Sequence, residues 1–179
     1  MGVCGDSVLR HAAAVGFDGR GNPVYRPFGR HRGQGIYEMV GRTLQDFPGT
    51  WRITREISDH RAGRVITGEG QAWLTPVPGG LDYAETLILA LPGQRPVVGA
   101  RRYLWRGSGA RITVAFDDGC PFHTILLDQV APRDRHHCAP DIYDVFYDFA
   151  VFPAWSVTWT VSGPRKNYVM TTQYAAVAN

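Results

Sequence analysis

Acidic, basic and phenolic side chains lie at alternate positions in two stretches of this sequence. Glu85 lies two residues after Tyr83, and Tyr103 lies two residues after Arg101. A carboxylate or a phenol beside a substrate can transfer a proton, and an arginine can stabilise negative charge that develops during a reaction. We therefore predict that Tyr83, Glu85, Arg101 and Tyr103 are catalytic residues, in a protein that uses no cofactor.

The stretches that carry these residues are predicted to be β-strands. From Gly49 onward, apolar and polar residues alternate with a period of two, and turns rich in glycine and proline interrupt the alternation. The predicted strands are nine, at 51–57, 64–74, 81–89, 97–105, 111–116, 122–128, 141–149, 154–161 and 167–174. No helix of crossover length separates them. The sequence therefore predicts an all-β fold, a single antiparallel β-barrel of about eight or nine strands, with a sandwich as the alternative.

The N-terminal residues differ from this pattern. Residues 1–48 are rich in glycine, arginine and histidine and show no strand alternation. Within them, residues 36–47 place their apolar side chains on one helical face, and Pro48-Gly49 ends that helix. We expect two parts: an N-terminal extension over 1–48, whose short helix caps the barrel and serves as a possible lid, and a barrel over 49–176.

Many polar residues share the inward-facing parity with large apolar ones. One face of every strand in a closed barrel points inward, so Arg55 is expected inside together with Trp51. Asp118 shares the parity of Phe116, although Asp117-Asp118-Gly119 is also typical of a hairpin turn. The predicted ligand-binding residues of an aromatic-lined cavity are Arg55, Trp105, Asp118, His123, Asp141, Tyr143, Tyr147, Trp155 and Trp159.

Charges in such an interior are expected to be paired, because an unpaired buried charge is costly. Glu85 and Arg101 lie on neighbouring predicted strands and are therefore expected to pair. Aromatic surroundings would raise the pKa of Glu85, unless Arg101 or Arg55 lowers it. Two interpretations fit these charges: a salt-bridge network that fixes the register of the barrel, and a ligand cavity with a few orienting polar groups.

One histidine- and cysteine-containing segment invites a metal interpretation. His136, Cys138, Asp141 and His123 are residue types that bind zinc, and His136 and Cys138 would point the same way in an extended segment. No C-x-x-C pair or H-E-x-x-H motif accompanies them. A structural role, with His136 donating to a backbone carbonyl, explains the segment equally well, so we predict no metal site.

The composition excludes several other classes. The 179 residues can bury a sizeable core, and the net charge of +3 is scattered, without the basic patch that nucleic-acid binding needs. No apolar stretch has the length of a membrane span. Three cysteines cannot all pair within one chain, which with the absence of a signal-peptide pattern predicts a cytoplasmic protein. The expected partner is a small molecule, and a homodimer is possible.

Several segments resemble a known family. Gly49-Thr50-Trp51 and Gly163-Pro164-Arg165-Lys166 resemble the calycin or lipocalin-like plan, which implies that the tryptophan packs under a basic residue from the C-terminal end and closes the barrel floor. Five segments resemble a bacterial lipocalin-like family of unknown function: Tyr83-Ala84-Glu85, Ala100-Arg-Arg-Tyr-Leu-Trp105, Phe116-Asp-Asp-Gly-Cys-Pro-Phe-His123, His136-His-Cys-Ala-Pro-Asp-Ile-Tyr143 and Gly163-Pro-Arg-Lys-Asn-Tyr168. The resemblance covers residues 49–174 and implies a lipocalin-like fold, but no reaction.

Two functions fit the predicted cavity. The first is an enzyme that holds a small, partly apolar, carbonyl- or carboxylate-bearing metabolite and acts on it by shape and acid–base groups, as a cofactor-independent cyclase, isomerase or lyase. The second is a non-catalytic carrier or sensor of a hydrophobic small molecule. A barrel filled by its own side chains, with a purely structural role, is a third possibility.

Overall fold

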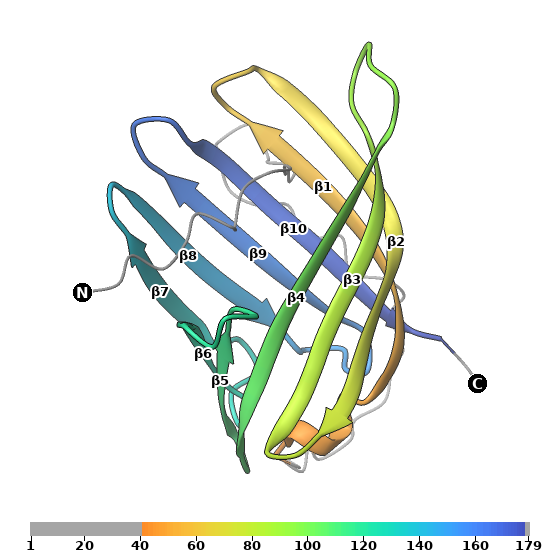
Figure 1. The fold of residues 1–179 in the computed structure, drawn as a ribbon, viewed down its shortest axis with the longest axis vertical. Coiled ribbons are helices and arrows are strands. Elements are labelled where there is room, and N and C mark those ends of the chain that lie inside the picture. The colour runs from red at the N-terminus through yellow and green to blue at the C-terminus, as the bar shows by residue number, and fades with distance from the viewer. Residues whose placement is uncertain (1–40, 178–179) are drawn as a thin grey trace, which may run out of the picture.

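The protein forms one antiparallel sheet that curls into a nearly closed barrel (Figure 1). The computed structural model describes residues 41–177. The ten strands are β1 (Gly49–Asp59), β2 (Arg64–Val77), β3 (Gly80–Ala90), β4 (Val97–Ser108), β5 (Arg111–Ala115), β6 (Pro121–Leu126), β7 (Arg133–Cys138), β8 (Asp141–Asp148), β9 (Trp155–Ser162) and β10 (Asn167–Ala176). Their order in the sheet is β6-β5-β4-β3-β2-β1-β10-β9-β8-β7. The all-β antiparallel barrel predicted from the sequence is confirmed.

The strand that the sequence did not indicate is β7. Its sequence, RDRHHC, contains no apolar alternation, yet it pairs with β8 over its full length. Every second residue of β7 is half-buried and the others are exposed, so the strand obeys the expected period with polar side chains. The barrel therefore has ten strands rather than eight or nine.

The alternation of burial follows the predicted parity in most strands. In β1, Trp51, Ile53, Arg55 and Ile57 are buried and the residues between them are exposed. In β8 the inward-facing residues are buried and the outward-facing ones are half-buried. The inward faces of all strands contribute to one aromatic-rich core. Within residues 41–177, no helix is long and apolar enough to cross a membrane.

Aromatic side chains close one end of the barrel, which we call the floor. A single turn of 3₁₀-helix, Leu44–Asp46, leads into this end, and Phe47 is fully buried there against Trp105 and Trp155. The indole Nε1–H of Trp51 donates to the carbonyl of Phe47 at 3.0 Å. Residues 36–40 of the helix predicted over 36–47 lie outside the described residues, and the described part, 41–47, contains only this turn. The proposed extension over 1–48 lies outside them as well, except for residues 41–48.

The basic residue expected beneath Trp51 lies elsewhere, and that expectation is wrong. Trp51 pairs with Ala176, whereas Asp59, at the far end of β1, pairs with Tyr168. The turn that contains Lys166 is therefore at the open end, opposite the floor (Figure 1). At the floor, the guanidinium of Arg42 lies 4.8 Å from the ring centroid of Phe149, so the cation comes from the N-terminal side of the barrel.

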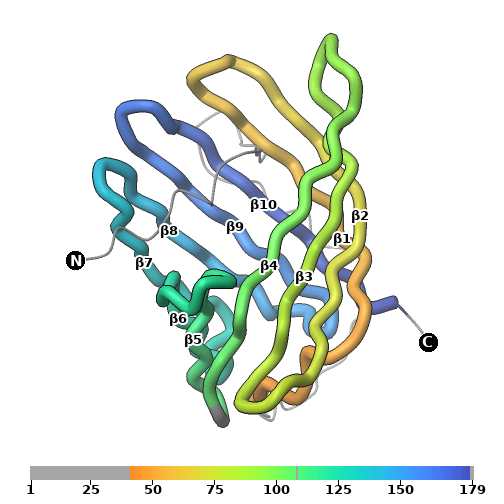
Figure 2. Tube along the Cα trace, in the orientation of Figure 1, coloured from red at the N-terminus to blue at the C-terminus, as the bar shows by residue number. Residues whose placement is uncertain are grey.

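The wall of the barrel is incomplete along one seam. β6 and β7 are the two ends of the strand order, and no backbone ladder joins them in the part of the chain that the structure describes. β5 pairs with β4 only over Leu104–Ser108, so the β5–β6 hairpin extends along only part of β4 (Figure 2). The remaining residues of β4, 97–103, thus border an opening in the side of the wall.

Candidate functional site

An ionic cluster occupies the middle of the barrel interior. The two terminal nitrogens of Arg55 on β1 donate to the two carboxylate oxygens of Glu85 on β3, at 2.8 and 2.7 Å. The Nε–H of Arg55 donates to the hydroxyl of Thr172 on β10 at 2.7 Å. Both charged side chains are almost fully buried. The cluster therefore links three strands with a bidentate ion pair, the strongest geometry for this pairing.

Two tyrosines extend the cluster toward the floor. The Tyr83 hydroxyl donates to Glu85 Oε2 at 2.5 Å and lies 2.9 Å from the hydroxyl of Tyr174. Burial alone would raise the pKa of Glu85, but the Arg55 cation and the hydrogen bonds from Arg55 and Tyr83 outweigh it, so the pKa is lowered. Burial and the negative charge of Glu85 raise the pKa of Tyr83 well above its usual value. Glu85 is thus held as a carboxylate and Tyr83 as a neutral phenol.

Small residues on β2 allow this pair to form. β2 lies between β1 and β3, and its register places Gly68 beside Arg55 and Ala72 beside Glu85. Gly70 lies between them, where a Cβ atom would come within 2.0 Å of the carbonyl oxygen of Thr86. The strand therefore presents no bulky side chain between the guanidinium and the carboxylate, which can meet across it.

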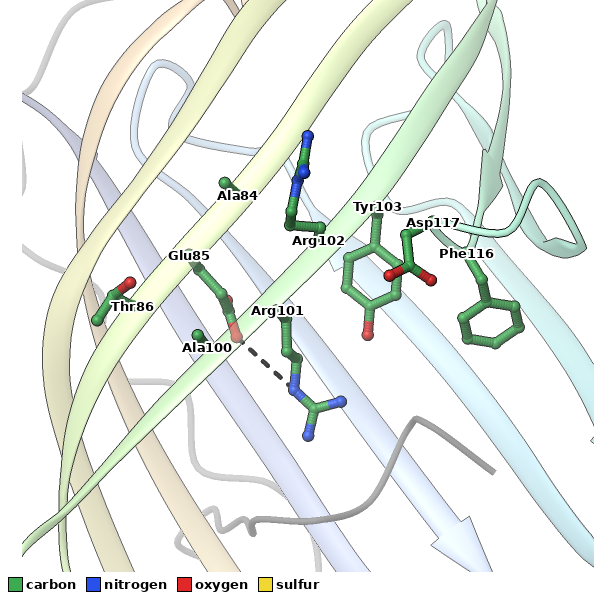
Figure 3. Close-up of a pocket in the computed structure, with 9 residues that line it drawn as sticks. All are labelled: Ala84, Glu85, Thr86, Ala100, Arg101, Arg102, Tyr103, Phe116 and Asp117. Atoms are coloured by element: carbon green, nitrogen blue, oxygen red, sulfur yellow. Dashed lines mark ion pairs between the residues drawn. The ribbon is translucent and has the colours of Figure 1, made fainter. Parts of the chain in front are cut away.

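A pocket of about 390 Å³ lies beside this cluster, at the opening in the wall. Its lining residues come from β3, from β4 and from the turn after β5: Ala84, Glu85, Thr86, Ala100, Arg101, Arg102, Tyr103, Phe116 and Asp117 (Figure 3). Arg101 and Tyr103 extend to one side of β4, and Arg102 extends to the other. The pocket therefore lies at the free edge of β4 and is open to solvent, unlike the enclosed central cavity that the sequence predicted.

Arg101 is the inward-facing cation of this pocket, which the outward-facing Arg102 also lines. The Nε of Arg101 lies 3.8 Å from Glu85 Oε1, so the predicted pair exists, although Arg55 is the closer partner of Glu85. Burial alone would lower the pKa of Arg101, but Tyr103 and Glu85 raise it. Arg101 retains some exposure, with 15% of its side chain accessible, so its charge is presented to the pocket.

A second polar group lies on the other side of the interior. His123 on β6 is buried, and its Nε2 lies 2.7 Å from the hydroxyl of Tyr147 on β8. The rings of Phe122 and Trp159 pack against the imidazole. Burial, with a smaller contribution from His136, lowers the pKa of His123 to about 3. This histidine is therefore neutral, unlike the charged residues of the first cluster.

The other predicted site residues divide between the two ends of the barrel. Trp105 and Trp155 belong to the aromatic floor. At the open end, Lys166 binds the buried carboxylate of Asp141 and the hydroxyl of Tyr143, each at 2.8 Å. None of the predicted residues Trp105, Trp155, Asp141 and Tyr143 lines the pocket. The prediction therefore assigned to one cavity residues that lie at different depths of the barrel.

Asp118 was predicted to point inward, and the structure shows that this is wrong. β5 ends at Ala115, so Asp118 lies in an exposed turn, where its carboxylate accepts the backbone N–H of Cys120 at 2.8 Å. The hairpin-turn interpretation of Asp117-Asp118-Gly119 is the correct one, since Gly119 has a φ of +86°. The neighbouring Asp117 and Phe116 line the pocket instead.

The histidine–cysteine segment forms no recognisable metal site. Among residues 41–177, no three histidine, cysteine or acidic side chains are grouped closely enough to hold an ion. The ring of His136 packs edge-on against the ring of Phe122 across the seam, with 5.0 Å between the centroids, which is a structural role. Cys138 is half-buried at the end of β7.

Sequence reasoning missed Thr172 and Tyr174 as members of the ionic cluster. Both share the inward-facing parity of β10 and both are buried. Their signal was weak because β10 pairs with β1, which lies more than a hundred residues away in the sequence. Phe116 was included in the predicted inward face but was not proposed as a site residue.

Comparison with known proteins supports the fold and identifies the family. No curated protein matches this chain in sequence. The solved structure of an S-type phycobiliprotein lyase, CPES, from Guillardia theta is similar, with a TM-score of 0.54 and 7% identity over 76% of this chain and 91% of that one. At this identity the likeness shows a common lipocalin-like barrel fold. In sequence, the family model described as a family of unknown function (DUF6314) matches residues 47–176, and the chain therefore belongs to that family.

Proposed function

We propose that this protein binds a small, partly apolar molecule bearing a carboxylate or carbonyl group, in the pocket at the free edge of β4. The observation that carries the proposal is the pocket itself, which brings the Arg101 guanidinium together with the rings of Tyr103 and Phe116. Ligand pockets of this size combine apolar walls with a few polar groups that orient the ligand. A guanidinium can bind a carboxylate through two parallel hydrogen bonds.

The ionic cluster supports this role by holding Arg101 in place. Glu85 is fixed by two bonds from Arg55 and one from Tyr83, so it presents a stationary negative charge to Arg101. Its lowered pKa and its full set of partners make Glu85 a poor general acid or base. We therefore assign Glu85 and Tyr83 to positioning, and Arg101 and Tyr103 to contact with the ligand.

A second candidate function is a cofactor-independent lyase, cyclase or isomerase reaction in the same pocket. The observation that favours it is that Tyr103 and Arg101 line the same pocket, which places a phenol near a cation. Such a pair can polarise a carbonyl group and stabilise the oxyanion that develops from it. A solved protein of the same fold is named as a lyase, which fits this candidate by fold analogy. Here Tyr103→Phe would preserve binding and abolish turnover.

The test of binding compares two fluorescent molecules that share one aromatic skeleton and differ by a single sulfonate group. We expect the anionic 8-anilinonaphthalene-1-sulfonate to bind about tenfold more tightly than the neutral N-phenyl-1-naphthylamine, because the anion bonds to a charged donor. Arg101→Ala should abolish this preference. Arg111→Ala, which removes an exposed cation at the floor end of β5, is the matched control and should retain it.

Two results would refute the proposal. One is a wild-type protein that binds neither molecule or shows no preference for the anion. The other is a preference that survives Arg101→Ala in a protein with an unchanged near-ultraviolet circular dichroism spectrum. If neither result is obtained, native mass spectrometry of protein purified from its own host, followed by denaturing extraction, would identify any natural ligand.

A further inference from the structure

The open-end half of β4 has a neighbouring strand on one side only. β3 pairs with β4 from Val97 to Arg106, whereas β5 pairs with it only from Leu104 to Ser108. Within residues 41–177, no strand pairs with residues 97–103 on the side away from β3. Alternate residues of a strand direct their backbone N–H and C=O groups to the same side, so about half of residues 97–103 present both groups at this free edge. Such an edge accepts a further strand.

The space beside this edge is in line with β5. The β5–β6 hairpin extends along only the floor-end part of β4, and the rest of the edge borders the opening in the wall (Figure 2). The pocket lies at this opening and ends at Phe116 and Asp117, in the turn after β5. Because the pocket is open to solvent, an added chain reaches the edge directly. A strand that starts beside this turn would continue the line of β5 toward the open end.

Two consecutive inward-facing positions of β4 determine which side chains such a strand would need. A Cβ atom at Gly99 would lie 3.4 Å from a methyl group of Leu89, so Gly99 leaves space beside an apolar side chain. Arg101 comes next, and 15% of its side chain is exposed. Residues directly opposite each other on antiparallel strands point to the same face. An added strand therefore suits an apolar residue opposite Gly99 and a carboxylate opposite Arg101.

The charges at the edge select against a purely apolar strand. Such a strand would remove the Arg101 guanidinium from water without offering it a counter-charge, which is costly, whereas a carboxylate would bind it through two hydrogen bonds. Asp117 lines the end of the pocket near Tyr103 and favours a basic residue there. On the outer face, Val98 is mostly exposed and favours an apolar residue opposite it.

We infer that the free edge of β4 binds an extended segment of a partner protein as an additional antiparallel strand. Antiparallel pairing continues the pairing of β5 with β4. In this direction the segment carries a basic residue opposite Tyr103, an acidic residue opposite Arg101, and apolar residues opposite Gly99 and Val98. Backbone bonds supply affinity in this mode of recognition, and alternate side chains supply selectivity. The inference rests on the proposed function, because a peptide here bears the carboxylate that Arg101 binds.

The first test titrates the full chain into a fluorescent peptide, Lys-Thr-Glu-Thr-Phe-Val-Thr, with blocked ends, and follows anisotropy. The same peptide with Gln in place of Glu should bind about tenfold more weakly, because the charged acceptor is lost. Arg101→Ala should abolish this difference. Arg111→Ala, which removes an exposed cation at the floor end of β5, is the matched control and should retain it. A peptide that does not bind, or a difference that survives Arg101→Ala, would overturn the inference.

The second test asks whether the peptide binds as a strand. Two versions are methylated on alternate backbone nitrogens, one at the odd and one at the even positions. Because alternate N–H groups of a strand face the same side, one version should lose at least about tenfold in affinity and the other should bind nearly as well as the parent. Equal effects of the two versions would show that the peptide does not bind by strand addition.

Hydrogen exchange locates the bound peptide. Saturation with the parent peptide should slow exchange in residues 97–103 at least about tenfold and leave β10 unchanged. Slow exchange of residues 97–103 before any peptide is added would overturn the inference. Light scattering would then distinguish a second copy of the chain, in a dimer, from the chain's own N-terminal residues, in a monomer.

Failure of this inference is distinct from failure of the proposed function. If 8-anilinonaphthalene-1-sulfonate shows the Arg101-dependent preference but no peptide protects residues 97–103, only the peptide inference fails. If the dye preference does not depend on Arg101, the proposed function fails, and with it the pairing of a peptide carboxylate with Arg101.

Discussion

Two polar clusters lie inside this barrel, and the same degree of burial has opposite effects on their charge. On β1 and β3, Arg55 and Glu85 are buried together, and each stabilises the charge of the other. On β6 and β8, His123 and Tyr147 are buried among aromatic rings. Within residues 41–177 no acidic group raises the pKa of His123, so burial holds the imidazole neutral. Burial without a partner removes a charge, and burial with a partner fixes it.

This difference separates the roles that the two clusters can serve. The charged cluster holds Arg101 at the pocket. It also makes the stability of the fold depend on both members of the ion pair. The neutral cluster makes the fold sensitive to acid, because a proton on His123 would create an unpaired buried charge. We therefore expect the loss of a charge to destabilise the first cluster and the gain of a charge to destabilise the second.

The largest effect is expected at the ion pair. Glu85→Gln leaves the Arg55 guanidinium buried without a negative partner, which should lower the free energy of unfolding by about 3–5 kcal/mol. Urea denaturation followed by tryptophan fluorescence measures this change. The double variant Arg55→Met with Glu85→Met removes both charges and should be more stable than the single one. A Glu85→Gln protein as stable as the wild type would show that the cluster carries no such dependence.

A smaller effect, specific to pH, is expected at the neutral cluster. The pKa of His123 in the folded protein is about 3, below its ordinary 6.5, so between these values the unfolded chain binds a proton that the folded protein does not. Acidification from pH 7 to about pH 4.5 should therefore lower the free energy of unfolding by about 2–3 kcal/mol through this residue.

The histidine contribution is isolated by comparison with His123→Phe. This variant should lose less stability than the wild type over the same pH interval, by roughly the amount attributed to His123. His136, whose pKa burial also lowers, remains in both proteins and cancels in the comparison. Parallel pH profiles for the two proteins would mean that the folded and the unfolded protein bind the proton on His123 equally readily. The contrast between the two clusters would then fail.

The smallest effect is expected for an ion pair on the outer face of β3 and β4. Arg102 bonds Asp82 at 2.6 Å, but 63% of the arginine side chain is exposed. Solvent screening limits such pairs, so Arg102→Ala should change the free energy of unfolding by less than about 1 kcal/mol. A loss comparable to that of Glu85→Gln, in the same urea titration, would show that burial is not what separates the two pairs.

The sequence predicted which face of each strand is buried, because the period of two directly sets side-chain direction. Arg55, Tyr83, Glu85, Tyr143 and Tyr147 are all buried as expected. Parity does not predict depth along the barrel axis. The pairing of Arg55 with Glu85 depends on the register of β1, β2 and β3 and on small residues in β2, none of which the alternation determines.

The errors have two causes. A basic residue of the segment Gly163–Lys166 was placed at the floor, although this hairpin lies at the open end, because the segment match does not indicate which end of the barrel a turn occupies. β7 was missed because its inward-facing residues are Asp134, His136 and Cys138, which carry no apolar signal. Asp134 and His136 contact β6 across the seam, so the strand with the weakest sequence pattern has an important structural position.

The free edge of β4 has one more consequence, for the behaviour of the protein at high concentration. In residues 41–177, no strand covers positions 97–103 on the side away from β3, and the outward-facing Val98 and Ile88, which pair with each other, are 68% and 60% exposed. An uncovered apolar edge is a template for strands from other molecules, and an inward-pointing charge on that edge opposes such association. We therefore expect Arg101 to oppose such association. Arg101→Lys would keep the inward-pointing charge but lose the planar fork through which we propose that the protein binds a carboxylate.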